Sequence, residues 1–171
     1  MKLRKLFFLT LALLLIGALA LAEGSGAQVG DECPDFELTT LSGDTFKLSE
    51  CRGKVVFINV WATWCPPCRA EMGDIDRLAA AYPDELAVIG VSIDELKSTV
   101  DAFIAENGYS YPVAMDDAGY TVSMKIFPSY YIPNSIFIDP NGVVTSIEAG
   151  SADYDTLEQR FKDALAHGAE S

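Results

Sequence analysis

The sequence is poor in basic residues and has almost no histidine. Its 171 residues include 12 lysines and arginines against 25 aspartates and glutamates, a formal net charge of -13. So acidic a chain repels the phosphates of nucleic acids and anionic lipids, and we expect neither as a partner. His167 is the only histidine. We place it in a tail past the last helix, without reactive neighbours in sequence, and expect no catalytic role for it.

Long hydrophobic runs are also lacking, except near the N-terminus. Lys2, Arg4 and Lys5 precede an almost wholly apolar stretch, 6–21, and the small residues at 20–22 suit cleavage. This layout predicts a secretory signal peptide over 1–22 and hence an exported protein. An uncleaved anchor is the alternative, because the run is long for a signal peptide and short for a spanning helix. Cleavage removes three bases and no acid, leaving 25 acids against 9 bases, a net charge of -16.

Internal repeats are absent, and small polar residues predict a linker over 23–30. The remainder, 31–168, suits one domain. We predict a β-hairpin from 33–38 and 45–48, strands at 54–61, 86–93, 111–115, 135–139 and 143–148, and helices at 65–82, 95–107, 117–125 and 153–166. Asp94 is the expected cap of the second helix. This order predicts an α/β fold with a central mixed sheet and helices on both faces.

The four cysteines are Cys33, Cys51, Cys65 and Cys68. In an exported protein they can persist as disulfides, and four cysteines are expected to form two pairs. Cys33 and Cys51 lie almost equally far from the hairpin turn, so antiparallel pairing predicts a structural disulfide between them. Two unpaired, partly buried thiols and a second redox-active pair are the alternatives.

Cys65 and Cys68 lie where a buried strand passes into a helix. The nucleophile in thiol-disulfide exchange is the thiolate, and a helix N-terminus favours an anion through its dipole and free N–H groups. The two-residue spacing lets a small disulfide close, which indicates redox chemistry. Neither Pro66 nor Pro67 has an N–H to offer the Cys65 thiolate. We therefore expect a weakly stabilised thiolate and a reducing protein.

Several motifs accompany this pair in order: Pro34-Asp35-Phe36, 59–64, Trp64-Cys65-Pro66-Pro67-Cys68, Gly90-Val91-Ser92, Ile132-Pro133 and 138–142. They resemble the thioredoxin superfamily, and more narrowly its exported thiol:disulfide oxidoreductases of the TlpA/ResA type. The resemblance implies a thioredoxin fold with an extra N-terminal hairpin and an insertion. It also implies a monomer without cofactor or metal that reduces disulfides of exported proteins, as in cytochrome c maturation. A membrane electron-transfer protein would be its donor.

The resemblance assigns roles around the motif. Cys65, with the better solvent access, is the expected attacking cysteine, and Cys68 the resolving one. Trp64 should pack beside the pair, with core filling as an alternative. Glu71 matches an acidic position of the ResA-like branch and would exchange a proton with the Cys68 thiol. Alternatively, it is a first-turn glutamate that suits the helix dipole. Asn59 replaces the buried acid of cytoplasmic thioredoxins and cannot titrate.

The residues before the last hairpin are the expected substrate contacts. Pro133 resembles the cis-proline opposite the CxxC motif, which would expose the backbone of Ile132 to an extended substrate. An ordinary trans proline is the alternative. Tyr130 and Tyr131 form either an apolar lip for a substrate or a cover for the core. Trp64 joins Tyr131, Ile132 and Pro133 in the predicted substrate site.

Three other functions remain open. An oxidant or isomerase would use the same dithiol at a higher reduction potential. Thr63 faintly suggests a peroxiredoxin-like peroxidase, although a CxxC motif behind a tryptophan does not suit that chemistry. A metal-binding protein would hold zinc with four thiolates or Cu(I) with the CxxC pair, although the cysteine spacing is not that of a zinc knuckle.

Overall fold

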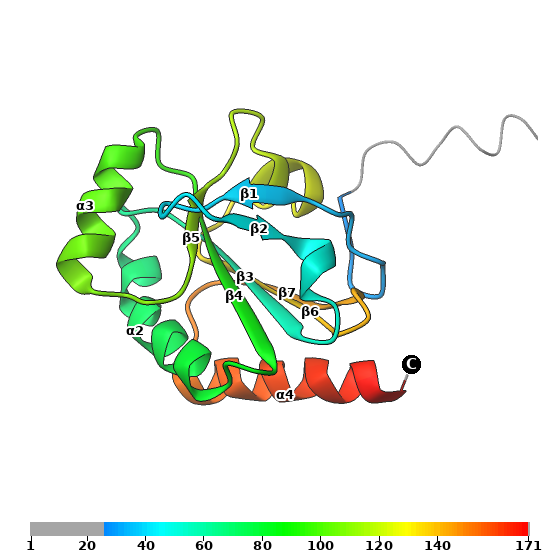
Figure 1. Cartoon of the computed structure of the whole chain (residues 1–171). Coiled ribbons are helices and arrows are strands. Elements are labelled where there is room, and N and C mark those ends of the chain that lie inside the picture. The colour runs from blue at the N-terminus through cyan, green and yellow to red at the C-terminus, as the bar shows by residue number, and fades with distance from the viewer. Residues whose placement is uncertain (1–25, 171) are drawn as a thin grey trace, which may run out of the picture.

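The computed structural model describes residues 26–170. The expected signal peptide, 1–22, and the first three residues of the expected linker, 23–25, therefore lie outside the described residues. Five strands form a central mixed sheet and two form a small separate sheet, as expected for a thioredoxin fold with an added hairpin (Figure 1). Among residues 26–170, no helix is both long and apolar enough to cross a membrane.

The central sheet has the strand order β5-β4-β3-β6-β7. β3 pairs parallel with β4, and β4 pairs parallel with β5. On the other side β3 pairs antiparallel with β6, and β6 pairs antiparallel with β7. The central strand, β3, is buried along its whole length, which explains why every residue of it except Asn59 is apolar. The strands span Val113–Met115 (β5), Leu86–Ser92 (β4), Val55–Trp61 (β3), Asn134–Ile138 (β6) and Val144–Ala149 (β7).

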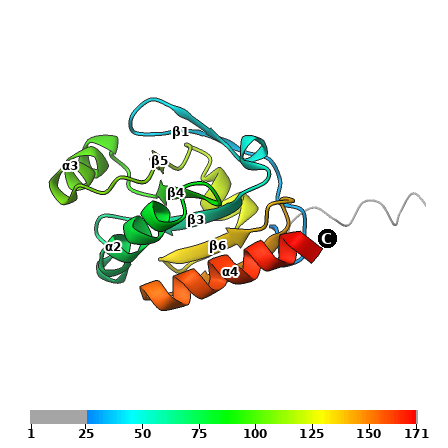
Figure 2. The ribbon, with the colours of Figure 1, turned by 60° about the horizontal axis from the view of Figure 1, so that its bottom comes forward.

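Each face of the sheet has its own core. α2 (Pro66–Ala81) and α4 (Tyr154–Glu170) cover one face (Figure 2). On that face Phe57 of β3 stacks on Phe137 of β6 at 4.3 Å between ring centroids. The opposite core contains the other residues of β3, such as Ile58, because side chains alternate along a strand. The elements that contribute to it are β1 (Glu37–Thr39), β2 (Thr45–Lys47), the 3₁₀-helix η1 (Leu48–Cys51) and the π-helix η2 (Thr121–Ile126).

The hairpin forms as predicted, but the disulfide expected across it does not. β1 and β2 pair antiparallel, and the Leu48 N–H continues the ladder to the Phe36 carbonyl. This register would set Cys33 opposite Cys51 if both strands ran on. Instead the chain turns into η1, whose rise is about 2.0 Å per residue against about 3.3 Å in a strand. Cys51 leaves the register, and both cysteines are free thiols.

Three helix ends differ from the prediction. The helix expected at 117–125 is the π-helix η2, which begins only at Thr121. α3 (Lys97–Asn107) ends at Gly108 in the left-handed conformation, φ 73°, as expected, but its N-cap is Leu96 and not Asp94. α4 continues to Glu170, so His167 lies in its last turn and not in a tail beyond it. The tail prediction was wrong because His167 has a tertiary partner that the sequence pattern does not show.

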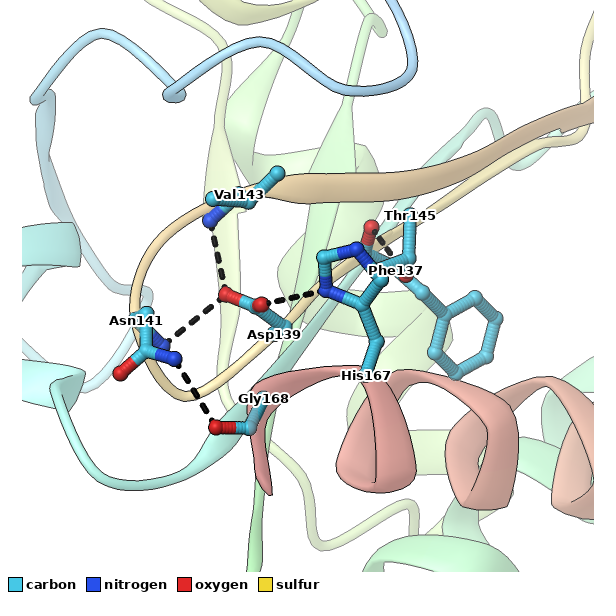
Figure 3. Close-up of polar contacts among 7 residues, drawn as sticks. All are labelled: Phe137, Asp139, Asn141, Val143, Thr145, His167 and Gly168. Carbon is cyan, nitrogen blue, oxygen red and sulfur yellow. Dashed lines mark hydrogen bonds and ion pairs between the residues drawn. The ribbon is translucent and has the colours of Figure 1, made fainter. Parts of the chain in front are cut away.

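That partner is Asp139, a buried carboxylate in the turn between β6 and β7 (Figure 3). Its Oδ2 lies 2.7 Å from His167 Nδ1, and its Oδ1 accepts the N–H groups of Asn141 at 2.9 Å and Val143 at 2.8 Å. Asn141 Nδ2 donates to the Gly168 carbonyl at 2.9 Å. The turn thus holds the end of α4 against the sheet.

Replacing Asp139 with alanine should destabilise the fold. The substitution removes the acceptor of two backbone N–H groups and the contact with His167. Because hydrogen bonds to a charged group contribute about 1.5–3 kcal/mol each, we expect the free energy of unfolding to fall by about 3 kcal/mol in urea titrations. Asp84→Ala, at an exposed position, is the control. A loss no larger than that of the control would show that the turn is stable without the carboxylate.

Candidate active site

The CxxC motif lies where β3 gives way to α2. β3 ends at Trp61, which is fully buried, and Pro66 and Pro67 occupy the first positions of α2. Proline suits a first helical turn because its φ is already helical and an N–H there would lack a helical partner. Cys65 is the N-cap residue and forms a disulfide with Cys68. Both sulfurs therefore lie at a helix N-terminus, as the sequence indicated.

Cys65 is the more accessible residue of the pair. Its exposed fraction is 4%, against 0% for Cys68. The Cys68 N–H donates to Cys65 Sγ at 3.3 Å, and it is the first amide of α2 able to do so because both preceding residues are proline. This single N–H and the helix dipole would stabilise a Cys65 thiolate. The geometry favours Cys65 as the sulfur that meets a substrate.

Asp94 holds the loop that precedes Cys65 in place through hydrogen bonds. Its carboxylate accepts the N–H of Thr63 at 2.9 Å, the Thr63 hydroxyl at 2.6 Å and the Ser92 hydroxyl at 2.8 Å. The prediction that Asp94 caps a helix was wrong. β3 and β4 are parallel with Trp61 opposite Ser92, so positions 63 and 94 follow neighbouring strand ends. Parallel pairing of these two strands was the signal that sequence reasoning missed.

A second loop approaches the same sulfur from the start of β6. The Ile132–Pro133 peptide bond is cis, as the resemblance implied. The Ile132 carbonyl oxygen lies 3.8 Å from Cys65 Sγ. The structure thus places Ile132 beside the disulfide, although it lies far from Cys65 in the sequence. A polypeptide bound at Cys65 would meet the backbone of Ile132.

Exposed aromatic rings flank both loops. Trp64 is 65% exposed and Tyr131 is 74% exposed, while Tyr130 is almost fully exposed. The core-filling alternative is therefore wrong for Trp64, and it is Trp61 that belongs to the core. The alternative in which the tyrosines cover the core is wrong for the same reason. Their exposure leaves both loops with apolar surface available to a substrate.

Glu71 is a buried carboxyl one turn beyond Cys68. Both residues are on the buried face of α2, as their i, i+3 spacing dictates, and Glu71 is only 2% exposed. Asn59 Nδ2 donates to Oε1 at 2.8 Å, and the Ala152 N–H donates to Oε2 at 2.9 Å. Burial raises the pKa of Glu71, while these two hydrogen bonds and the charge of Arg160 oppose the rise. A carboxyl with a raised pKa is suited to proton exchange near neutral pH.

Cys33 and Cys51 do not join this site. Cys33 belongs to the core on the hairpin side of the sheet, whereas Cys65 and Cys68 belong to the core beneath α2. Burial raises the pKa of the Cys33 thiol to about 12 and also raises the pKa of Cys51. Thiols of this kind stay protonated and unreactive at neutral pH. The alternative of a four-cysteine zinc site is wrong, since the cysteines do not converge.

The fold and the CxxC disulfide define a thioredoxin-like thiol:disulfide oxidoreductase. Residues 29–147 match the model of the AhpC/TSA family, and the chain belongs to that family. It is 36% identical to the thioredoxin-like protein YneN of Bacillus subtilis over 139 residues, 80% of each chain. It is also 36% identical to the thiol-disulfide oxidoreductase ResA of Oceanobacillus iheyensis over 173 residues, 94% of this chain and 88% of the relative.

A solved structure shows the same architecture. The protein described as thiol:disulfide interchange protein DsbE of Chlorobium tepidum superposes with a TM-score of 0.73 at 32% identity. The match covers 82% of this chain and 99% of the other. The ResA relative and this structural neighbour therefore agree on an oxidoreductase that acts on disulfide substrates.

Proposed function

We propose that this protein reduces disulfides of exported proteins outside the cytoplasm, as in cytochrome c maturation. The observation that carries the proposal is the Cys65–Cys68 disulfide at the N-terminus of α2, with the Ile132 backbone beside Cys65 Sγ. The N-terminal stretch 1–22 supports export. A membrane electron-transfer protein is the proposed donor, and the protein is proposed to act as a monomer. It needs no cofactor because its two thiols carry both electrons.

The site supports a two-step exchange. The Cys65 thiolate attacks one sulfur of the substrate disulfide, and the other substrate sulfur leaves as a thiolate that takes up a proton. Glu71 accepts the proton of the Cys68 thiol, and Cys68 then attacks Cys65 Sγ. The substrate leaves as a dithiol, and the protein keeps the Cys65–Cys68 disulfide. Substrate is held by Trp64, Tyr131, Ile132 and Pro133.

The direction of the reaction follows from how the thiolate is stabilised. A strongly oxidising dithiol owes its potential to a stabilised reduced form. Here the first two amides of α2 are replaced by Pro66 and Pro67, and the Cys68 N–H remains as the donor to Cys65 Sγ. The thiolate of Cys65 therefore gains less than it would from a full set of N–H groups, which favours a reductase over an oxidant or isomerase.

The reduction potential tests this direction. We expect a value near or below about -270 mV for the Cys65/Cys68 pair in a thiol redox buffer. The fluorescence of Trp64, exposed and adjacent to Cys65, reports the redox state. A variant with Cys33→Ala and Cys51→Ala isolates the pair from the two free thiols. A potential near about -120 mV would contradict the proposal and assign the protein to disulfide formation.

A further inference from the structure

Several buried polar side-chain atoms beneath α4 have no hydrogen-bond partner. α4 packs against β3, β6 and β7, and Figure 2 shows it lying along β6. Among residues 26–170, the unpartnered atoms on this side of the sheet include Asn59 Oδ1, Ser135 Oγ, Ser146 Oγ and Arg160 Nη1. Buried polar atoms are nearly always paired, so a group of exceptions in one place calls for a physical explanation.

The pairing of the strands shows why these side chains are neighbours. Asn59 is opposite Ser135, and Phe137 is opposite Ser146. Phe137 belongs to the core beneath α2 and α4, and Ser135, two residues earlier in β6, lies on the same face. Side chains directly opposite in an antiparallel pair are about 4.5–5.5 Å apart at Cβ. A polar band therefore crosses the sheet from Asn59, which donates to Glu71, to β7.

Arg160 brings a positive charge to this polar band. It lies three residues after Leu157 and four before Ala164, both fully buried, so it borders the face that α4 turns toward the sheet. Helical side chains tilt toward the helix N-terminus, so Arg160 extends back toward Ala152, whose N–H donates to Glu71. Its Nη1 is buried, and within the described part of the chain no carboxylate forms an ion pair with it.

Most groups that face Glu71 carry no charge. Asn59 of β3 and the N–H of Ala152 are neutral donors to its carboxylate. Tyr111, before β5, stays a neutral phenol because burial raises its pKa. Cys68, one turn earlier on α2, is the thiol whose proton Glu71 is proposed to accept. None of these groups offsets the cost of a negative charge at Glu71 with a positive one.

Arg160 is the cation whose charge acts on Glu71. Burial raises the pKa of Glu71, and the charge of Arg160 opposes that rise. On α2, Arg77 pairs with Asp74 at 3.5 Å and its side chain is 63% exposed, so solvent screens it. Glu148 of β7 faces the same side of the sheet as the polar band, but it is exposed. Charges interact over longer distances in the protein interior than in water, so the buried end of Arg160 reaches Glu71 electrostatically.

We propose that Arg160 is a positioning residue for the resolving step: from beneath α4 its charge keeps Glu71 ionised and ready to receive the proton of Cys68. The inference rests on the proposed reductase function. In this step the proton moves from Cys68 Sγ to the Glu71 carboxylate, and the Cys68 thiolate attacks Cys65 Sγ. The bond from Cys65 to the substrate sulfur breaks, and the substrate leaves as a thiolate. Arg160 exchanges no proton, because a guanidinium stays protonated in proteins.

The variant Arg160→Gln tests the proposal, because it removes the charge and keeps a polar side chain. The reduced full chain is mixed with a disulfide peptide, and acid quenching over a pH series gives the rate of resolution. We expect the midpoint of this pH profile to rise by roughly one unit, the lower end of the effect of a nearby opposite charge. Below the midpoint the rate should fall roughly 10-fold, and above it the rate should match the wild type. Arg160→Lys keeps the charge and should keep the midpoint close to that of the wild type.

A titration without substrate measures the same effect directly. Carbon-13 NMR of the oxidised protein, labelled at the glutamate carboxyls, follows the ionisation of Glu71, and the signal is assigned by its loss in Glu71→Gln. Arg160→Gln should raise the pKa of Glu71 in this titration. Glu148→Gln is the matched control, because it removes an exposed charge on the same face of the sheet and should produce no such rise.

Failure of this inference and failure of the proposed function give different results. If Arg160→Gln leaves the NMR midpoint of Glu71 unchanged, the inference is overturned and the reductase function stands. A resolving rate that Arg160→Gln lowers equally at every pH gives Arg160 a structural role and also overturns it. So does a further loss of rate when Arg160→Gln is added to Glu71→Gln. If the wild-type chain reduces no disulfide peptide, the proposed function and the role in resolution both fall, whereas a raised NMR midpoint still demonstrates the action of Arg160 on Glu71.

Discussion

The variant Cys68→Ser should form a stable mixed disulfide with a substrate and turn over no faster than uncatalysed exchange. Cys65, the more accessible cysteine, still attacks in this variant, but the thiol that would resolve the adduct is gone. The variant Cys65→Ser should form no adduct, because the remaining thiol at position 68 is fully buried. Both single variants therefore lose turnover, but only Cys68→Ser accumulates the mixed disulfide with the substrate.

Non-reducing electrophoresis and intact mass measure this difference directly. Both variants are made in a background with Cys33→Ala and Cys51→Ala, so that the hairpin thiols cannot contribute an adduct. A mono-disulfide peptide is the substrate, and added dithiothreitol should release it from the Cys68→Ser protein. An adduct on the Cys65→Ser protein, with none on the Cys68→Ser protein, would mean that the attacking and resolving roles are reversed.

The active-site motif could be read from the sequence because local chemistry dictates its position. An apolar run such as Val55–Trp61 has to be buried on both faces, and Pro66 and Pro67 suit the first helical turn. Together they place the cysteines at a strand-to-helix junction without knowledge of any tertiary contact. The strands that form the sheet, and the hairpin before them, followed from the same local reasoning.

The misassigned residues depend on contacts between distant parts of the chain. Asp94 has the chemistry of a helix cap, but the parallel register of β3 and β4 offers it Thr63 instead. His167 has no neighbour in sequence that would place it at Asp139. The hairpin disulfide was predicted from symmetry about a turn, and the change of rise in η1 removed that symmetry for Cys51. In each case a tertiary partner or a local helix overrode a correct local preference.

An apolar hollow beside the loop before Pro133 illustrates the same limit, and it is lined by Val60, Ile93, Tyr120, Ser123, Met124, Ser129, Tyr131 and Ile132. Tyr131 was predicted as a substrate contact from its place before Pro133, and it does line the hollow. Tyr120 and Met124, which also line it, were not predicted, because they are the N-cap residue and a member of a π-helix that carries no chemical motif. A positive φ at a tyrosine is not readable from composition, since it is imposed by the carboxylates of Asp116 and Asp117. Surfaces built from several elements emerge only when the elements are packed.

Replacing Glu71 with glutamine should slow the resolving step by about 10²-fold or more, the range typical of lost general acid-base catalysis. In the wild type the carboxylate accepts the proton of Cys68, so the rate of resolution rises as pH rises through the pKa of Glu71. Burial raises that pKa above its ordinary value and so moves the rise in rate to higher pH. In Glu71→Gln this part of the pH profile should vanish, while formation of the mixed disulfide by Cys65 continues.

Single-turnover measurements separate the two steps. Rapid acid quenching of the reduced protein mixed with a disulfide peptide counts the mixed disulfide against the resolved product over a pH series. Glu106→Gln is the matched control, because Glu106 is exposed on α3, away from the buried face of α2. If Glu71→Gln resolves the mixed disulfide at the wild-type rate and with the wild-type pH profile, Glu71 has only a structural role.

The free energy of unfolding should change with pH in the opposite direction to the rate of resolution. Because the pKa of Glu71 is higher in the folded than in the unfolded state, the folded protein binds more protons between those two values. Its free energy of unfolding therefore falls as pH rises from the ordinary carboxyl pKa to the raised one. Glu71→Gln should lack this fall, and urea titrations at several pH values measure it. Ionisation of Glu71 supplies the base for Cys68, and the same ionisation lowers the free energy of unfolding. The rate of resolution and the stability of the fold therefore depend on this carboxyl in opposite directions.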